Sequence, residues 1–372
     1  MNAPRADIPM GPVGRDFAGV AKLVVVKDKD TSLLKQYLMH LSALRTRFNQ
    51  LNNQGDTGPG AIQLMQQTLD GNGSELAETL KFVDEQMLTG MPDSQKQAIR
   101  PLLVRPLMQA FEVIIKPVTA EINKIWQAQV YAPFQVKLAG KYPFAANAKI
   151  EASHADIAEL FGGEGAIARF FDSALGSLVI RRGDGITVRT WAGLGVALSP
   201  LAQNGFAGWV APLSSGGVPT ASSSTSSQWV FQMQALPSPG TLEYTIDIDG
   251  QKLRYRNTES HWADFVWPSA QGVPGARVVA TNYQGQVIEV VNFPGKFGFK
   301  RLIDAAQKTK HPDGVFELNW VNTGVSIAAN LKIISKPDSG NDTAGAPQAT
   351  GYHGLSLPES ILSPVPSTAT GG

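Results

Sequence analysis

The chain has 372 residues, 43% of them hydrophobic, and is long enough to bury a large core and to form two domains plus tails. Its 32 Lys and Arg residues balance 31 Asp and Glu residues, and this formal charge of +1 argues against nucleic acid as a partner. The lack of cysteine excludes disulfides, thiol catalysis and zinc–thiolate sites, and the sequence contains no apolar run of about 18 residues that would span a membrane.

The first residues, MNAPRADIPMGPVGRDFAG, lack the continuous apolar segment of a signal peptide. This start fits either a cytoplasmic protein or a part of a longer protein whose targeting element lies elsewhere. We expect residues 1–19 to form a flexible N-terminus.

Residues 20–211 have the pattern of a helical domain. Leucines and aromatic residues repeat at helical spacing in segments such as DTSLLKQYLMHLSALRTRFNQL. A later segment contains Pro106 and Pro117, which we expect to bend or break its helix. The predicted helix starts carry capping residues, namely Asp30 or Thr31, Ser74, and Ser153 with Asp156.

Residues 212–227, PLSSGGVPTASSSTSS, are expected to be a flexible linker or a long loop, because they contain almost only Ser, Thr, Gly and Pro. Beyond them the hydrophobic period changes to two, and we assign residues 228–336 to a β-domain. Residues 337–372 read as a low-complexity tail. The predicted fold class is therefore α+β: an N-terminal all-helical domain, a mainly antiparallel β-sandwich-like domain and a disordered C-terminal tail.

The segment TIDIDGQKLRY contains two aspartates, Asp247 and Asp249, which suit either a metal site or a hairpin. The metal interpretation is weak, because an EF-hand-like loop counted from Asp247 has Thr258 where a glutamate is needed. A two-residue turn at Asp249-Gly250 instead pairs apolar residues on one face and opposite charges on the other. The hairpin residues are Tyr244, Ile246, Asp249, Gly250, Leu253 and Tyr255. Because asparagine also suits this turn, we expect Asp249→Asn to be almost silent.

No catalytic, cofactor-binding or metal-ligating residues are predicted. The sequence has no phosphate loop, dinucleotide fingerprint, HExxH motif or nucleophile elbow. The five histidines are scattered without ligand spacing, and no carboxylate pair stands out. We therefore predict that the protein is not an enzyme.

Two apolar segments are candidates for partner binding. Trp262, Phe265 and Trp267 are expected in a loop, where they either plug the end of the β-domain or anchor a partner protein or glycan. In the tail, GLSLPESILSPV is either disordered or becomes ordered on a partner or at the outer membrane. Its candidate contacts are Leu357, Ile361 and Leu362.

Several ordered blocks resemble the C-terminal periplasmic region of the IcmF/TssM family, the large inner-membrane subunit of the type VI secretion system. The segment at 140–175, GKYPFAANAKIEASHADIAELFGGEGAIARFFDSAL, is similar to the block that opens this region. The hairpin IDIDGQKLRYRN, the Trp267-Pro268 segment followed by GVPGARV, and Arg301 to Asp304 in FGFKRLIDAA follow in the family's order. The resemblance runs from about residue 13 to residue 336.

The resemblance implies a periplasmic scaffold within an inner-membrane-anchored protein, whose anchor is not in this chain. It implies docking of the outer-membrane lipoprotein TssJ, contacts with other copies of the protein, and contact with TssL through regions absent here. Two other hypotheses stay open. One is a carbohydrate-binding or peptidoglycan-acting β-domain that uses Trp262 and Trp267, and the other is an adhesin-like module whose helical half is dispensable.

Overall fold

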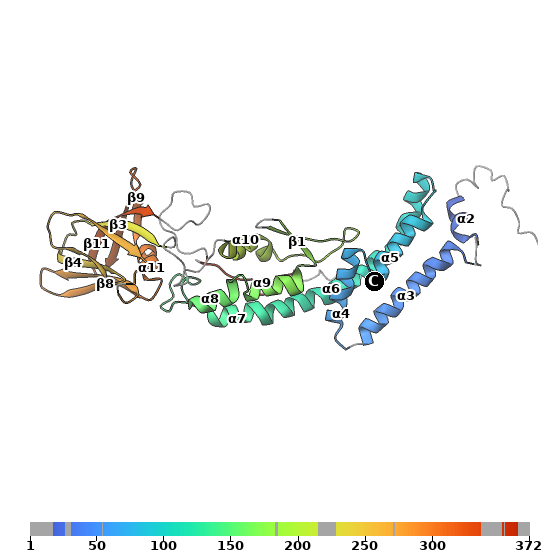
Figure 1. The fold of residues 1–372 in the computed structure, drawn as a ribbon, viewed down its shortest axis with the longest axis horizontal. Coiled ribbons are helices and arrows are strands. Elements are labelled where there is room, and N and C mark those ends of the chain that lie inside the picture. The colour runs from blue at the N-terminus through green and yellow to red at the C-terminus, as the bar shows by residue number, and fades with distance from the viewer. Residues whose placement is uncertain are drawn as a thin grey trace, which may run out of the picture. The chain divides into compact units, whose positions relative to one another are not determined.

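A computed structural model of the chain describes residues 18–26, 31–53, 55–182, 185–214, 228–270, 272–335, 352 and 354–363 (Figure 1). The chain forms two compact units, each assembled from segments that alternate along the sequence. Unit 1 comprises residues 1–131, 169–206 and 357–372, and unit 2 comprises residues 132–168 and 207–356. Most of the predicted N-terminus, linker and tail lies outside the described residues. The domain limits expected from the sequence stay predictions, since compactness within one chain does not test independent folding.

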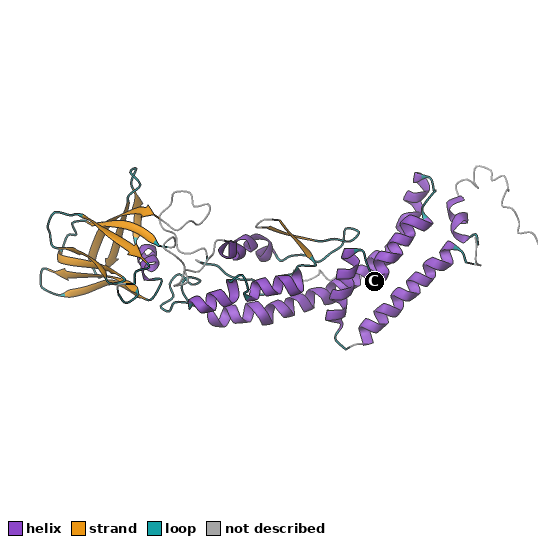
Figure 2. Cartoon of the chain, viewed as in Figure 1, coloured by secondary structure: helices purple, strands orange, loops and turns teal. Residues whose placement is uncertain are grey.

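Helices dominate unit 1 (Figure 2). Ser74 caps α5 by accepting hydrogen bonds from the backbone N–H groups of Leu76 and Ala77, as the sequence predicts. The cap of α3 is one residue later than expected, because the Ser32 hydroxyl accepts from Lys35 N–H. Elements labelled η are short π-helical segments. The elements up to the end of this helical stretch are α2 (Ala18–Val24), α3 (Leu33–Asn53), α4 (Thr57–Asp70), α5 (Glu75–Phe82), η1 (Val83–Met87), α6 (Asp93–Trp126) and η2 (Gln127–Tyr131).

The prolines of α6 do not break it. The helix runs for 34 residues through Pro101, Pro106 and Pro117. A proline removes one backbone hydrogen bond, but much of this helix is also held by an apolar stripe that includes Leu107 and Phe111, both fully buried. Of the two expected effects of Pro106 and Pro117, a bend or a break, the structure contradicts the break. None of the described helices has the length and apolar character needed to cross a bilayer.

The region predicted to be all-helical also contains one short hairpin, in which β1 (Val179–Arg182) pairs with β2 (Gly185–Val188). The remaining elements of this region are α7 (Ala132–Lys137), α8 (His154–Phe161), α9 (Ala166–Phe170), η3 (Phe171–Leu175) and α10 (Pro200–Ser214). Ser153 caps α8 by accepting from Ala155 and Asp156, as predicted.

Unit 2 contains two antiparallel sheets, which agrees with the predicted β-sandwich-like domain. The five-stranded sheet has the order β6-β3-β11-β10-β9, and the four-stranded sheet has the order β5-β4-β7-β8. The strands are β3 (Trp229–Ala235), β4 (Thr241–Ile248), β5 (Gln251–Tyr255), β6 (Trp262–Trp267), β7 (Gly275–Asn282), β8 (Val287–Pro294), β9 (Gln307–Lys310), β10 (Phe316–Asn322) and β11 (Val325–Ser335). One helix, α11 (Gly298–Ala305), follows β8.

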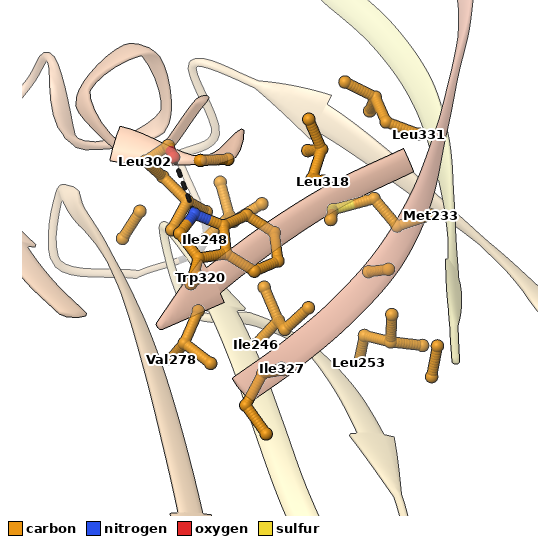
Figure 3. Packing of buried hydrophobic residues seen from close by; sticks show 14 of the residues in the cluster. Met233, Ile246, Ile248, Leu253, Val278, Leu302, Leu318, Trp320, Ile327 and Leu331 are labelled. Carbon is orange, nitrogen blue, oxygen red and sulfur yellow. Dashed lines mark hydrogen bonds between the residues drawn. The ribbon is translucent and has the colours of Figure 1, made fainter. Parts of the chain in front are cut away.

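The core of the sandwich follows from the alternation of apolar side chains along its strands. Inward residues of both sheets form one buried cluster, with Ile246 and Val278 facing Trp320 and Ile327 (Figure 3). Helix α11 adds Leu302, whose carbonyl accepts a hydrogen bond of 2.8 Å from the Trp320 indole N–H. The two sheets thus share one closed apolar core, which makes the sandwich a rigid platform for surface contacts.

Candidate functional site

The aspartate segment forms the hairpin expected from the sequence. Tyr244 pairs with Tyr255, Ile246 with Leu253 and Asp247 with Lys252, between β4 and β5. The turn residues Asp249 and Gly250 have φ values of 47° and 83°. Two successive positive φ angles are typical of a type I′ turn, which matches the twist of the paired strands.

Asp249 is more than the corner of this turn. Its side chain is buried, at 2% exposure. One carboxylate oxygen accepts a hydrogen bond of 2.8 Å from Gly275 N–H, and the other accepts one of 3.1 Å from Ser269 N–H. The Asp249 N–H in turn donates to the Gly275 carbonyl at 2.8 Å. The carboxylate therefore joins the hairpin to the start of β7.

This contact overturns the expectation that Asp249→Asn is silent. An amide group offers one acceptor oxygen in place of two and leaves one buried N–H group without its partner. We expect Asp249→Asn to lower the free energy of unfolding by about 1–3 kcal/mol, measured by urea denaturation. Asp264→Asn is the matched control, because Asp264 is exposed, and it should change stability by less than about 0.5 kcal/mol. Equal stabilities of the two variants would contradict the role assigned to Asp249.

Neither aspartate is arranged as a metal ligand. The Asp247 carboxylate accepts from Gly250 N–H at 3.0 Å and lies 3.3 Å from Arg277 and 4.0 Å from Lys252. Protein donors therefore already occupy both carboxylates. The described part of the chain holds no group of three His, Asp or Glu side chains that could bind a metal ion.

The aromatic segment is a strand rather than the predicted loop. In β6, Phe265 and Trp267 point into the core, where they are 1% and 4% exposed. Phe265 stacks on Phe231 with 5.5 Å between ring centroids, and Trp267 lies 5.4 Å from Phe299. Trp262, on the opposite face of the strand, stays 38% exposed. Of these three candidates for partner binding, Trp262 presents its ring to solvent.

The tail candidates pack against the chain itself. Residues 357–363, here called the C-terminal strap, lie in unit 1, and Ile361 and Leu362 are fully buried there. The Asn123 side chain of α6 bonds both the N–H and the carbonyl of Leu362, at 2.9 and 3.0 Å. The Trp126 indole N–H donates to the Pro358 carbonyl at 2.8 Å. Leu357 is also buried, at 6% exposure, so the strap is ordered by unit 1 in this structure.

The strap is also paired as a strand. Leu198 and Leu362 form an antiparallel bridge. Ser199 N–H donates to the Ile361 carbonyl at 2.9 Å, and Ser363 N–H donates to the Ala197 carbonyl at 2.8 Å. Residues 197–199 form main-chain hydrogen bonds with one edge of the strap, and Asn123 and Trp126 of α6 bond to its other backbone groups. These bonds compensate for the burial of the strap's backbone N–H and C=O groups.

Unit 2 contains a charged cluster that was not predicted from the sequence. Arg301 of α11 is 8% exposed and lies 3.6 Å from the Glu151 carboxylate, while its other guanidinium nitrogen donates to the Ala148 carbonyl at 2.8 Å. The Tyr142 hydroxyl donates to Asp304 at 2.7 Å. Tyr142, Arg301 and Asp304 line a cavity of about 480 Å³. The Arg301 and Asp304 spacing in FKRLIDA was visible in the sequence, but their partners are distant along the chain.

Burial sets the protonation of this cluster. It raises the pKa of the Glu151 carboxyl, although the Phe297 N–H and Arg301 act in the opposite direction. Burial and the neighbouring Asp304 also raise the pKa of the Tyr142 hydroxyl. The charges of Arg301 and Glu151 compensate one another. Together with the bonds from Arg301 to Ala148 and from Tyr142 to Asp304, this pair holds residues 142–151 against α11.

His154 lies next to this cluster and gives unit 2 a pH dependence. Burial lowers the pKa of His154, and the charges of Lys296 and Lys300 lower it further. As the pH falls below about 6.5, the unfolded chain therefore binds a proton before the folded chain does, and stability is lost. The raised pKa of Glu151 acts with the opposite sign, because the folded state takes up that proton first.

A substitution separates the two contributions. The His154 ring packs edge-on against Phe297, with 4.9 Å between centroids, and a phenylalanine at position 154 would keep this contact. We expect His154→Phe to lose less stability than the parent chain when the pH is lowered from about 7.5 to about 5.5. The free energy of unfolding at the two pH values checks this. The same loss in both proteins would mean that His154 does not contribute.

Exposed apolar side chains gather at one end of the sandwich, here called the sandwich tip. Its members are Leu242, Tyr283, Val287 and Val321, which are 49%, 64%, 71% and 59% exposed. The strand ends that carry them are joined, since Thr241 pairs with Asn282, and the Asn322 side chain donates to the Glu289 carbonyl at 3.0 Å. A register shift in β4 falls at Leu242. Sequence patterning did not single out this surface, because its residues come from three separate segments, namely β4, the β7–β8 hairpin and β10.

Comparisons with known proteins cover both the helical region and the sandwich. Residues 117–204 match the helical domain of the type VI secretion protein IcmF, and residues 231–335 match its C2-like domain. The type VI secretion system component TssM1 of Pseudomonas aeruginosa is 24% identical over 256 residues, which are 65% of this chain and 22% of that protein. The chain thus spans about a fifth of the length of this curated relative.

Solved structures share the fold. A chain of a structure titled type VI secretion system membrane core complex matches with a TM-score of 0.72 and 23% identity, over 95% of this chain and 71% of that chain. The C-terminal domain of the type VI secretion protein TssM from EAEC matches with a TM-score of 0.50 and 21% identity, over 66% of this chain and 99% of that one. Fold and matches together define a protein in which a helical region precedes a C2-like β-sandwich. The chain belongs to the IcmF/TssM family of type VI secretion proteins.

Proposed function

We propose that this chain is a structural, non-catalytic part of a type VI secretion membrane complex and acts as a scaffold in the periplasm. The observation that carries the proposal is the match of two IcmF family models, helical and C2-like, in one order along the chain. Its relative TssM1 is much longer, and we place the inner-membrane anchor and the contact with TssL in regions outside this sequence. A chain with balanced charge suits protein partners rather than nucleic acid.

The sandwich tip is the surface we assign to the outer-membrane lipoprotein TssJ. Four large apolar side chains that stay exposed around joined strand ends are typical of a protein docking surface. The rigid sandwich core holds them in place, so little conformational entropy is lost on docking. Of the residues predicted from the sequence, Phe265 and Trp267 support this platform from the core.

Helix α6 offers a surface for sister subunits. Leu102 and Val113 are 73% and 64% exposed, and their separation of 11 residues places them on one face of the helix. On the buried face, the strap residues Leu357, Ile361 and Leu362 hold α6 in unit 1. Their contribution to assembly is thus to support the helix that presents the contact.

Binding of this chain to purified TssJ tests the proposal. We expect association in the micromolar range or tighter, and we expect the double variant Tyr283→Ser, Val287→Ser to weaken it by about tenfold or more. Both residues are exposed, so the fold should persist, as circular dichroism can verify. Trp262→Ala is the control, because Trp262 lies outside the tip, and it should bind like the parent chain. Lack of association between the parent chain and TssJ would overturn the lipoprotein assignment.

A further inference from the structure

The outer face of the five-stranded sheet carries an ordered row of polar side chains that starts at a tryptophan. Trp262 of β6 pairs with Gln234 of β3, Gln234 with Asn330 of β11, and Asn330 with Glu317 of β10. Each of these residues is outward-facing, because its neighbours along the strand point into the core. With a strand spacing of about 4.8 Å, the row is roughly 14 Å long.

This row forms the floor of a groove, here called the amide groove. The groove encloses about 630 Å³, and its lining includes Trp262, Gln234, Leu236, Asn330, Glu317 and His311. Its volume falls in the range of small-molecule sites, roughly 300–1,000 Å³. It lies on the other sheet from Tyr283 and Val287 of the sandwich tip, and its residues have no part in the docking proposed above.

The polar groups of the groove are held in position before any ligand arrives. The Asn330 amide donates to the Gln234 side-chain oxygen at 3.1 Å, and the Gln234 amide donates to the Ser260 carbonyl at 3.4 Å. The His311 ring lies 3.3 Å from one oxygen of Glu317. Each amide carries two N–H donors and an oxygen with two acceptor positions, so capacity for further hydrogen bonds remains on both.

The chemistry of the lining selects the class of ligand. No lysine or arginine lines the groove among the residues that the structure describes, which argues against an anionic ligand. Alternating donors and acceptors beside an exposed indole ring match a neutral molecule that carries hydroxyl or amide groups around apolar C–H faces. The row also crosses the strands, whereas a peptide added to a sheet would run parallel to an edge strand.

We propose that the amide groove binds a linear glycan, with one sugar ring stacked on Trp262 and the following units hydrogen-bonded to Gln234, Asn330 and Glu317. This function goes beyond the scaffold role and does not depend on it. In a periplasmic protein, such a groove would give the scaffold a contact with the glycan strands of the cell wall.

Titration of the whole chain with chitotetraose and with cellotetraose, followed by calorimetry and by the indole N–H signals in NMR spectra, tests this proposal. We expect at least one of the two sugars to bind and to shift the Trp262 indole signal. Trp262→Ala and Asn330→Ala should each weaken binding by about tenfold or more. Tyr283→Ala, which removes an exposed aromatic ring of the same unit, is the matched control and should bind sugar normally.

Three outcomes would overturn the proposal: binding of neither sugar to the parent chain, unchanged binding in Trp262→Ala, or loss of TssJ binding in Trp262→Ala with no sugar bound. The last outcome would identify the groove as a protein contact. Co-sedimentation with insoluble peptidoglycan distinguishes polymeric glycan strands from short free sugars. If the groove binds polymeric strands, the parent chain should sediment with the peptidoglycan and Trp262→Ala should not. Failure of the glycan proposal leaves TssJ binding at the tip unaffected, so the two proposals can fail separately.

Discussion

Replacing both Ile361 and Leu362 with alanine is expected to destabilise unit 1 strongly. Each side chain is fully buried, and each truncation should cost about 2–5 kcal/mol of unfolding free energy. The two residues are adjacent, so their effects need not add. The double variant should also expose the face of α6 that carries Asn123, whose side chain bonds Leu362.

Hydrogen exchange along α6 is the direct measurement, because it reports on this unit without requiring two-state unfolding of the whole chain. We expect faster exchange around Asn123 and Trp126 in the double variant. Leu201→Ala is the control, since Leu201 is 66% exposed, and it should change stability by less than about 0.5 kcal/mol. Unchanged exchange in α6 of the double variant would show that the strap contributes nothing to unit 1.

The second large effect is expected at Trp320 in the sandwich core. Trp320→Ala should lower the unfolding free energy by about 3–5 kcal/mol, because it removes a fully buried ring between the two sheets. Trp320→Phe keeps most of the ring but leaves the Leu302 carbonyl without its indole donor, and we expect a smaller loss of about 1–3 kcal/mol.

Urea denaturation followed by circular dichroism measures both variants. The matched control is Trp262→Ala, in which a tryptophan of the same domain is removed from the surface, and we expect little change in stability. If Trp320→Ala and Trp262→Ala were equally stable, the core around Trp320 would not be the main source of stability of the sandwich.

Local patterns in the sequence were sufficient to predict the hairpin and two of the three helix caps, whereas the cap of α3 is Ser32 rather than Asp30 or Thr31. The Asp249-Gly250 turn and its register depend on residues within one short segment, and the caps at Ser74 and Ser153 depend on neighbours two or three residues away. Strand β6 was interpreted as a loop even though Ala263, Phe265 and Trp267 alternate with outward residues. The aromatic residues on both faces hid that alternation.

Interactions between distant residues were out of reach for sequence patterns. The Asp249 carboxylate bonds Ser269 and Gly275, and Arg301 bonds Ala148, so neither role follows from local spacing. The strap was noticed as an apolar segment within a low-complexity tail, either disordered or ordered on a partner, but its packing against α6 was not predicted. The strap is buried because it packs against α6, and the tail sequence contains no information about that distant surface.

The strap also shows how the two units are connected along the chain. The backbone passes between the units four times, at residues 131/132, 168/169, 206/207 and 356/357, so neither unit is formed by one continuous stretch of the chain. Each unit therefore depends on segments that the other unit separates along the sequence. A break in the chain at 168/169 or at 206/207 would leave neither unit with all of its segments on one fragment.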